Sequence, residues 1–154
     1  MSVLDRFKLN GKRLFITGGS RGLGREMALA IADAGADVIL TGRDEESLRK
    51  TAQDITDLGR EAQFITADMA KPEICQSVCE EAIKKYGPIT ILINNIGGRR
   101  QNIPTEEMPL EVWQELIDLN ITSTFLCTKI IGGHMIQNET GGRIINTASI
   151  NAFV

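Results

Sequence analysis

The 154-residue sequence has little of the material from which metal centres, disulfide frameworks or membrane spans are built. It contains one histidine and three cysteines, and an odd number of cysteines does not make a paired framework. No apolar run approaches the about 20 residues that cross a bilayer, and the N-terminus lacks the apolar core of a signal peptide. The formal net charge is −3, with both signs interspersed, so neither nucleic acid nor a membrane is an expected partner. These absences together favour a protein of the reducing cytoplasm.

Two of the three cysteines, Cys75 and Cys79, are four residues apart and share one face of a predicted helix. A zinc pair is the alternative for such spacing. Because His134 is the single histidine and no further ligands cluster in the sequence, we interpret these residues and Cys127 as small buried hydrophobes. We expect no metal site.

Short apolar runs alternate along the chain with helical patterns. The runs predict five buried strands, at residues 13–17, 37–41, 63–66, 89–93 and 143–147. Strand–helix alternation with short connections predicts a Rossmann-type, doubly wound parallel sheet in a three-layer α/β/α arrangement. No linker or repeat divides the chain, so we expect a single α/β domain over residues 1–154.

Two helical patterns carry specific expectations. In the first helix, the stripe predicted to face the sheet is made of Leu23, Met27, Ala30, Ile31 and Ala34. The last pattern predicts one long helix from about 109 to 135, which the glycine pair at 132–133 could interrupt. On it, Trp113 and Phe125 are interpreted as core or helix-packing residues.

A glycine-rich turn, Thr17-Gly-Gly-Ser-Arg-Gly-Leu-Gly24, follows the first predicted strand and opens the first helix. Its glycines at 18, 22 and 24 permit a tight turn and a close backbone approach to a ligand, and a helix N-terminus attracts phosphate oxygens. The spacing is Gly-x-x-x-Gly-x-Gly, which is neither a Walker loop nor Gly-x-Gly-x-x-Gly. Taken alone, it is also compatible with a turn that binds nothing.

Together with three later segments, this turn resembles the short-chain dehydrogenases/reductases. Asn94-Asn-Ile-Gly97 is similar to that family's Asn-Asn-Ala-Gly element, with Ile96 in place of the usual alanine. Asn120 resembles the helix asparagine of its active site, and the segment 144–149 resembles the strand that ends in its catalytic serine, here Ser149. The resemblance runs from Lys12 to the last residue. The local sequence around these segments is similar to that of gluconate 5-dehydrogenase-like and 3-oxoacyl-carrier-protein-reductase-like members of the family.

The resemblance implies a site at the carboxyl ends of the strands. For catalysis it implies Asn120 in a water-linked proton relay and Ser149 orienting the substrate carbonyl; a capped helix asparagine and a turn serine are the structural alternatives. The residues it implies for cofactor binding are Gly18, Ser20, Arg21, Gly22, Leu23, Gly24, Arg43, Asp68, Met69, Asn95 and Gly97.

The end of the second strand indicates which dinucleotide is bound. An acidic residue there binds a ribose 2′-hydroxyl, whereas an arginine accommodates a 2′-phosphate. The sequence places Gly42 and then Arg43 at this point, and Arg21 adds a second guanidinium. Asp44 is the opposing observation, and we interpret it as a helix N-cap. We therefore expect NADP(H), with NAD(H) as the less favoured alternative.

The family's catalytic Tyr-x-x-x-Lys pair does not occur in the 154 residues. The single tyrosine, Tyr86, has threonine four residues later. We expect an oxidoreductase that interconverts a carbonyl and a secondary alcohol, with this chain alone inactive and forming part of a longer, homo-oligomeric enzyme. The alternatives are a non-catalytic dinucleotide-binding module and, against the motif series, another Rossmann-type enzyme such as a methyltransferase. We expect a small-molecule substrate, which would be anionic if Arg99 and Arg100 attract it; a solvated loop pair is the simpler interpretation of these two residues.

Overall fold

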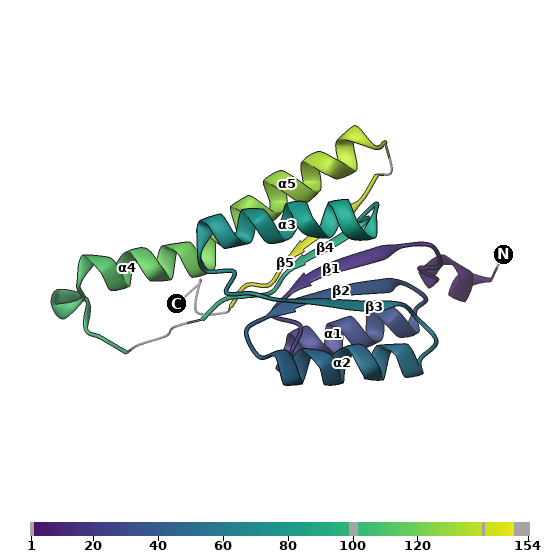
Figure 1. Ribbon diagram of the computed structural model, residues 1–154, viewed down its shortest axis with the longest axis horizontal. Helices are drawn as coiled ribbons and strands as arrows, with labels where there is room; N and C mark the ends of the chain where they lie inside the picture. Colours follow the sequence, from purple (N-terminus) through teal and green to yellow (C-terminus); the bar gives the residue numbers. More distant parts are fainter. Residues whose placement is uncertain (1, 99–101, 140, 150–154) are drawn as a thin grey trace.

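The computed structural model describes residues 2–98, 102–139 and 141–149, and its centre is a five-stranded parallel sheet (Figure 1). The strands are β1 (Arg13–Thr17), β2 (Asp37–Gly42), β3 (Ala62–Thr66), β4 (Ile91–Asn94) and β5 (Arg143–Asn146). Their order is β3-β2-β1-β4-β5, and every neighbouring pair is parallel. The chain therefore adds β2 and β3 on one side of β1 and then crosses back to add β4 and β5 on the other side. The predicted fold class is confirmed.

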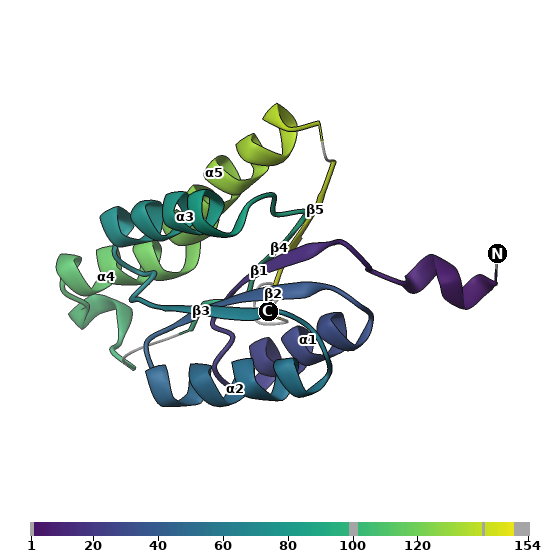
Figure 2. The same cartoon turned by 45° about the vertical axis from the view of Figure 1, so that its right-hand side comes forward.

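Helices cover both faces of the sheet. On one face lie α1 (Gly22–Asp33) and α2 (Glu45–Asp57), and on the other lie α3 (Pro72–Tyr86) and α5 (Ser123–Gln137) (Figures 1 and 2). The helix α4 (Leu110–Ile117) continues the line of α5 beyond the sheet. Short 3₁₀ turns occur at η1 (Val3–Phe7) and η2 (Thr105–Glu107). The sheet lies between the two layers of helices and divides the apolar core into two halves.

Each half of the core is formed by alternate residues of the same central strands. Leu14 and Ile16 of β1 pack toward α1 and α2, whereas Phe15 packs toward α3 and α5. All three side chains are fully buried, as expected for a strand that is covered on both faces. At the edge of the sheet, Ile144 and Ile145 of β5 remain partly exposed.

The inward stripe predicted for α1 was partly wrong: Met27 and Ile31 pack against the core as predicted, but Leu23 does not face it. The buried residues of α1 are Gly24, Ala28 and Ala32, while Leu23 is 71% exposed. Small residues face the sheet because α1 approaches it closely at the glycine-rich turn, which leaves no space for a leucine.

The predicted long helix exists but is interrupted at a different place. Residues Asp118–Thr122 form a π-helical turn, η3, between α4 and α5, and the glycine pair lies inside the continuous helix α5. Trp113 and Phe125, interpreted as core or helix-packing residues, are not core residues, since they are 52% and 59% exposed. Within the described residues, we find no helix of the length and apolar character that a bilayer crossing requires.

Candidate functional site

The glycine-rich turn lies at the carboxyl end of β1, where its backbone folds over the first turn of α1. Gly18 and Gly22 have φ values of +71° and +56°, which L side chains rarely adopt. A Cβ at Gly24 would overlap the Gly18 carbonyl oxygen and lie 2.5 Å from Asn95 Nδ2. Backbone N–H groups at the start of α1 are consequently left close to open space, as a phosphate cradle requires.

The tips of β1 and β4 are joined by side-chain hydrogen bonds. The buried hydroxyl of Thr17 accepts from the backbone N–H groups of Asn95 and Ile96, each at 3.0 Å. The Asn95 amide donates to the carbonyl oxygens of Thr17 at 3.1 Å and Gly18 at 3.3 Å. Asn95 therefore holds the glycine-rich turn in position from the neighbouring strand.

A second amide links β4 to β5. Asn94 is buried, and its Nδ2 donates to Thr128 Oγ1 at 3.1 Å and to Asn146 Oδ1 at 2.9 Å. Thr147 Oγ1 then donates to Asn95 Oδ1 at 3.5 Å. The ends of three adjacent strands are thereby held in one register at the sheet's carboxyl edge.

A cleft of about 230 Å³ opens above this edge. It is lined by residues of three strand tips and one helix turn, namely Gly18, Ser20, Arg21, Gly42, Arg43, Asn95, Ile96, Gly97 and Leu119. Eight of these nine belong to segments that the sequence analysis assigned to cofactor binding or to the family motifs. The cleft lies where doubly wound sheets bind their ligands.

Two guanidinium groups stand at one end of the cleft. Arg21 and Arg43 are exposed, and neither forms a salt bridge with a carboxylate of the described chain. Asp44 caps α2, as predicted, by accepting from the Ser47 backbone N–H at 3.1 Å and from the Ser47 hydroxyl at 2.7 Å. These hydrogen bonds from Ser47, with the charge of Arg21 adding to them, lower the pKa of Asp44.

Gly42 is the last residue of β2 and directly precedes Arg43. A Cβ at this position would meet Ser20 Oγ at 3.4 Å and Leu48 Cδ2 at 3.5 Å, both ordinary contacts. The backbone at the end of β2 would therefore accept a Cβ without a clash.

At the tip of β3, the two residues assigned to the cofactor differ in accessibility. The Asp68 carboxylate accepts from the Ala70 backbone N–H at 3.2 Å, and Lys71, rather than Asp68, is the N-cap of α3. Met69 is fully buried among core residues between the sheet and α3. Met69 as a whole is 0% exposed and is not among the residues that line the cleft described above.

Asn120 lies in the π-helical turn and faces the segment after β4. Its Nδ2 donates to the Leu116 carbonyl at 2.8 Å and to the Gly98 carbonyl at 3.1 Å, and its Oδ1 accepts from the Gly98 N–H at 2.9 Å. An added Cβ at Gly97 would lie 3.0 Å from the same Oδ1. π-Helical turns are frequent at functional sites, because they reposition a side chain within a helix.

Ser149 is exposed, three residues after the end of β5. It has an interaction within the structure and so is not a free hydroxyl. Arg99 and Arg100, the expected anion-attracting pair, lie outside the described residues.

Leu119 is the cleft residue that sequence reasoning missed. It is buried in the π-helical turn beside Asn120, and no local pattern distinguishes it from other apolar helix residues. Its position in the cleft depends on the turn, which the sequence analysis did not anticipate.

Strand order 3-2-1-4-5, a glycine cradle at the β1–α1 junction and a cleft across the strand tips define the class of Rossmann-type dinucleotide-binding proteins. A sequence model described as short chain dehydrogenase matches residues 12–154. The chain belongs to the short-chain dehydrogenase family, whose members bind nicotinamide dinucleotides.

Individual relatives are similar over nearly the whole chain. A 2-dehydro-3-deoxy-D-gluconate 5-dehydrogenase of Escherichia coli is 35% identical over 151 residues, which are 98% of this chain and 58% of the relative. A crystal structure of a putative NAD(P)-dependent gluconate 5-dehydrogenase from Beutenbergia cavernae, with bound NADP, is 32% identical with a TM-score of 0.88, and the match covers 96% of this chain and 58% of that one. A 7α-hydroxysteroid dehydrogenase complexed with NADH is 30% identical with a TM-score of 0.91, covering 100% and 59%. The chain thus spans less than two thirds of the length of each of these relatives.

Proposed function

We propose that the protein is a cytoplasmic, NADP(H)-dependent oxidoreductase that interconverts a carbonyl and a secondary alcohol. The observation that carries the cofactor choice is the pair Arg21 and Arg43 at the rim of the cleft, beside a glycine at the end of β2. Among the described residues neither guanidinium has a carboxylate partner, and two such groups suit a phosphate dianion, since each donates paired hydrogen bonds. The three buried cysteines, all free thiols, favour a reducing compartment.

The residues of the cleft fit the cofactor by their chemistry. The cradle at Gly18 and Gly24 admits pyrophosphate oxygens, and the amide of Asn95 fixes the wall on which the nicotinamide ribose would lie. When bound, the nicotinamide supplies or accepts the hydride. The protein's part is to bind, to orient the carbonyl and to move a proton.

We assign two polar groups to that part. Ser149 would donate a hydrogen bond to the substrate carbonyl, and Asn120 would hold a water on its proton path. In the described structure Asn120 already fixes the Gly98 backbone, so its side chain is held in one orientation.

The proton donor itself is not among these residues. Tyr86 ends α3 and lines a pocket with Arg13 and Asp37, which begin β1 and β2. Its hydroxyl therefore lies at the opposite end of the sheet from the cleft. We propose that the donor comes from outside the 154 residues and that this chain alone performs no turnover.

The experiment is a fluorescence titration of the intact protein with NADPH and NADH, followed by reduction assays on small carbonyl compounds, including sugar acids. Tighter NADPH binding with NADPH-dependent reduction is the expected result. Equal dissociation constants would refute the cofactor assignment. Dinucleotide binding without turnover by the intact protein would favour a non-catalytic binding module instead.

We further propose that the complete protein is a homo-oligomer. Trp113 of α4, Ile121 of η3 and Phe125 of α5 are 52%, 61% and 59% exposed, and together they form an apolar surface along one continuous helical segment. Light scattering on the intact protein is expected to give a multiple of the monomer mass, and a monomer at micromolar concentration would contradict this.

A further inference from the structure

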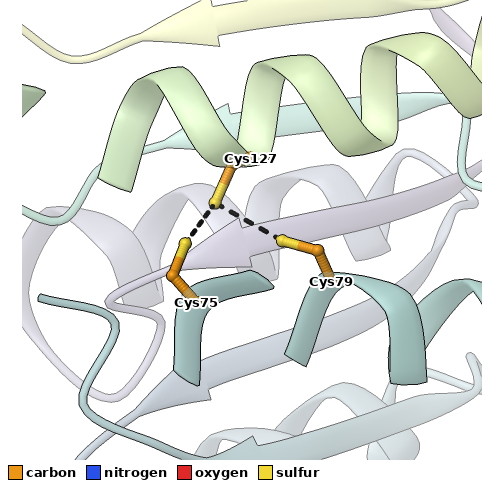
Figure 3. Close-up of side chains that lie close together, drawn as sticks. All are labelled: Cys75, Cys79 and Cys127. Atoms are coloured by element: carbon orange, nitrogen blue, oxygen red, sulfur yellow. Dashed lines mark hydrogen bonds between the residues drawn. The ribbon is translucent and has the colours of Figure 1, made fainter. Parts of the chain in front are cut away.

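Three thiols from two helices meet in the core between α3 and α5 (Figure 3). Cys75 and Cys79 are one turn apart on α3, and both face Cys127 on α5. The Sγ atoms of Cys75 and Cys79 each lie 3.6 Å from the Sγ of Cys127, and all three sulfur atoms lie within 4.8 Å of one another. The prediction that these cysteines are buried is confirmed, since all three are 0% exposed. As candidate metal ligands, however, the sequence analysis considered only Cys75 and Cys79.

The spacing of the sulfur atoms matches three-coordinate ligation of one soft ion. Soft ions hold thiolates at about 2.3 Å, which places the sulfurs of a planar three-sulfur site about 4 Å apart and those of a pyramidal site closer. Two edges of the sulfur triangle, at 3.6 Å, already have such a length, and the third is no longer than 4.8 Å. In the described part of the chain, no histidine nitrogen or carboxylate oxygen joins the three sulfurs, so a tetrahedral ligand set is not present.

The apolar surroundings of the three thiols determine which ion charge is favoured. The thiols belong to an apolar cluster that includes Phe15, Ile39, Val78, Ala82 and Ile131. The nearest polar group is the Ser123 carbonyl, which accepts from Cys75 Sγ at 3.7 Å and carries a partial negative charge. Three thiolates leave a net charge of −2 with a monovalent ion and −1 with a divalent ion, but none with a trivalent one. An uncompensated charge in this core is costly, so the neutral complex is favoured.

We propose that Cys75, Cys79 and Cys127 form a capture site for a trivalent thiophilic metalloid, with trivalent arsenic as the representative. A pyramidal trivalent ion uses three sulfur ligands and keeps a lone pair where a fourth ligand would stand. The proposal uses none of the residues assigned to the cofactor cleft.

The reaction balances without an oxidant or reductant. Arsenous acid and three thiols give one tris-thiolate and three waters. Three As–O bonds break, three As–S bonds form, and each thiol proton leaves with a hydroxide as water. Arsenic stays trivalent, and no charge enters the core.

The test is incubation of the intact, reduced protein with sodium arsenite, read by native mass spectrometry and by arsenic-edge X-ray absorption. Because the thiols are buried, one sample is refolded from denaturant in arsenite so that access does not limit the reaction. The variants are C75A, C79A and C127A, with S77A on the exposed side of α3 as the matched control. Circular dichroism establishes that each variant is folded.

We expect one arsenic per chain with three sulfur neighbours in the parent protein and in S77A, and a higher melting temperature with arsenite present. Each cysteine variant should bind at least tenfold more weakly, with fewer sulfur neighbours. If a single variant fails to fold, the other two carry the comparison. No adduct after refolding in arsenite, an adduct with two sulfurs in the parent, or an adduct unchanged by all three variants would overturn the proposal. Parallel samples receive Zn²⁺ or Cu⁺ and contain no arsenite. Stoichiometric binding of either ion in them would overturn the trivalent assignment.

Discussion

Asn120 and Gly98 are joined by two hydrogen bonds that run in opposite directions. The Gly98 N–H donates to Asn120 Oδ1 at 2.9 Å, and Asn120 Nδ2 donates back to the Gly98 carbonyl at 3.1 Å. One side chain therefore satisfies both backbone groups of a residue 22 positions away, and it ties the π-helical turn to the segment after β4. Removal of this side chain should affect structure even before any effect on chemistry.

We predict that Asn120→Ala lowers the free energy of unfolding by about 1–2 kcal/mol, because two backbone groups lose their partner. Urea unfolding measures the loss, and hydrogen exchange at the Gly98 amide should accelerate in step. Asn120→Asp keeps the acceptor and loses the donor, so it should protect the Gly98 amide more than alanine does. An unchanged exchange rate at Gly98 in the alanine variant would contradict the assigned contact.

Gly24→Ala should abolish dinucleotide binding and destabilise the fold. The new Cβ would overlap the Gly18 carbonyl and press on the Asn95 amide, so the cradle would have to open. Gly133→Ala is the matched control, because a Cβ at Gly133 meets nothing within 4 Å inside α5. We expect that control to raise stability by up to about 1 kcal/mol through helix propensity. Thermal melts and fluorescence titration of both variants make the comparison, and equal behaviour would refute it.

Substitutions at Thr17 test the hydrogen bonds that join the tips of β1 and β4. Thr17→Val conserves shape but leaves the N–H groups of Asn95 and Ile96 without their acceptor. Since each unmet buried donor costs about 1–3 kcal/mol, the loss in unfolding free energy should be at least about 2 kcal/mol. Thr17→Ser restores the hydroxyl and should recover most of it. Should valine and serine prove equally stable in urea, the hydroxyl has no such role.

Arg43 tests cofactor choice. Arg43→Ala should weaken NADPH binding by about ten- to a hundredfold, as expected for the loss of charge-assisted hydrogen bonds to a phosphate, and should leave NADH nearly unchanged. Arg6→Ala, which removes a guanidinium from η1 at the far N-terminus, is the control and should alter neither. The measurement is the ratio of the two dissociation constants. An Arg43→Ala protein with the parent's ratio would remove this residue from the cofactor's recognition.

The sequence was informative where structure depends on local pattern. Apolar runs located the strands within two residues of their observed ends, and strand–helix alternation led to the right sheet. Asp44 was recognisable as a cap because its partner, Ser47, is three residues away. The family motifs indicated most of the residues that line the cleft.

Features that depend on distant contacts were not predictable. The π-helical turn follows from the hydrogen bonds of Asn120 with Gly98, which no helical periodicity encodes. The third member of the cysteine cluster, Cys127, is 48 residues from Cys79, and only the packing of α3 against α5 brings them together. The stripe of α1 was partly misplaced because close packing against the sheet, rather than hydrophobicity, decides which residues face inward.

The tolerance of a Cβ at Gly42 has an evolutionary consequence. The position tolerates a Cβ with ordinary contacts to Ser20 and Leu48, and its side chain would project into the cleft beside Arg43. Under the cofactor assignment proposed above, an acidic substitution at this one codon would set a negative charge beside Arg43, and an acidic residue at this point of the fold binds a ribose 2′-hydroxyl. Descendants of this protein could thus pass between the cell's biosynthetic and catabolic pools of reducing equivalents in a single mutational step.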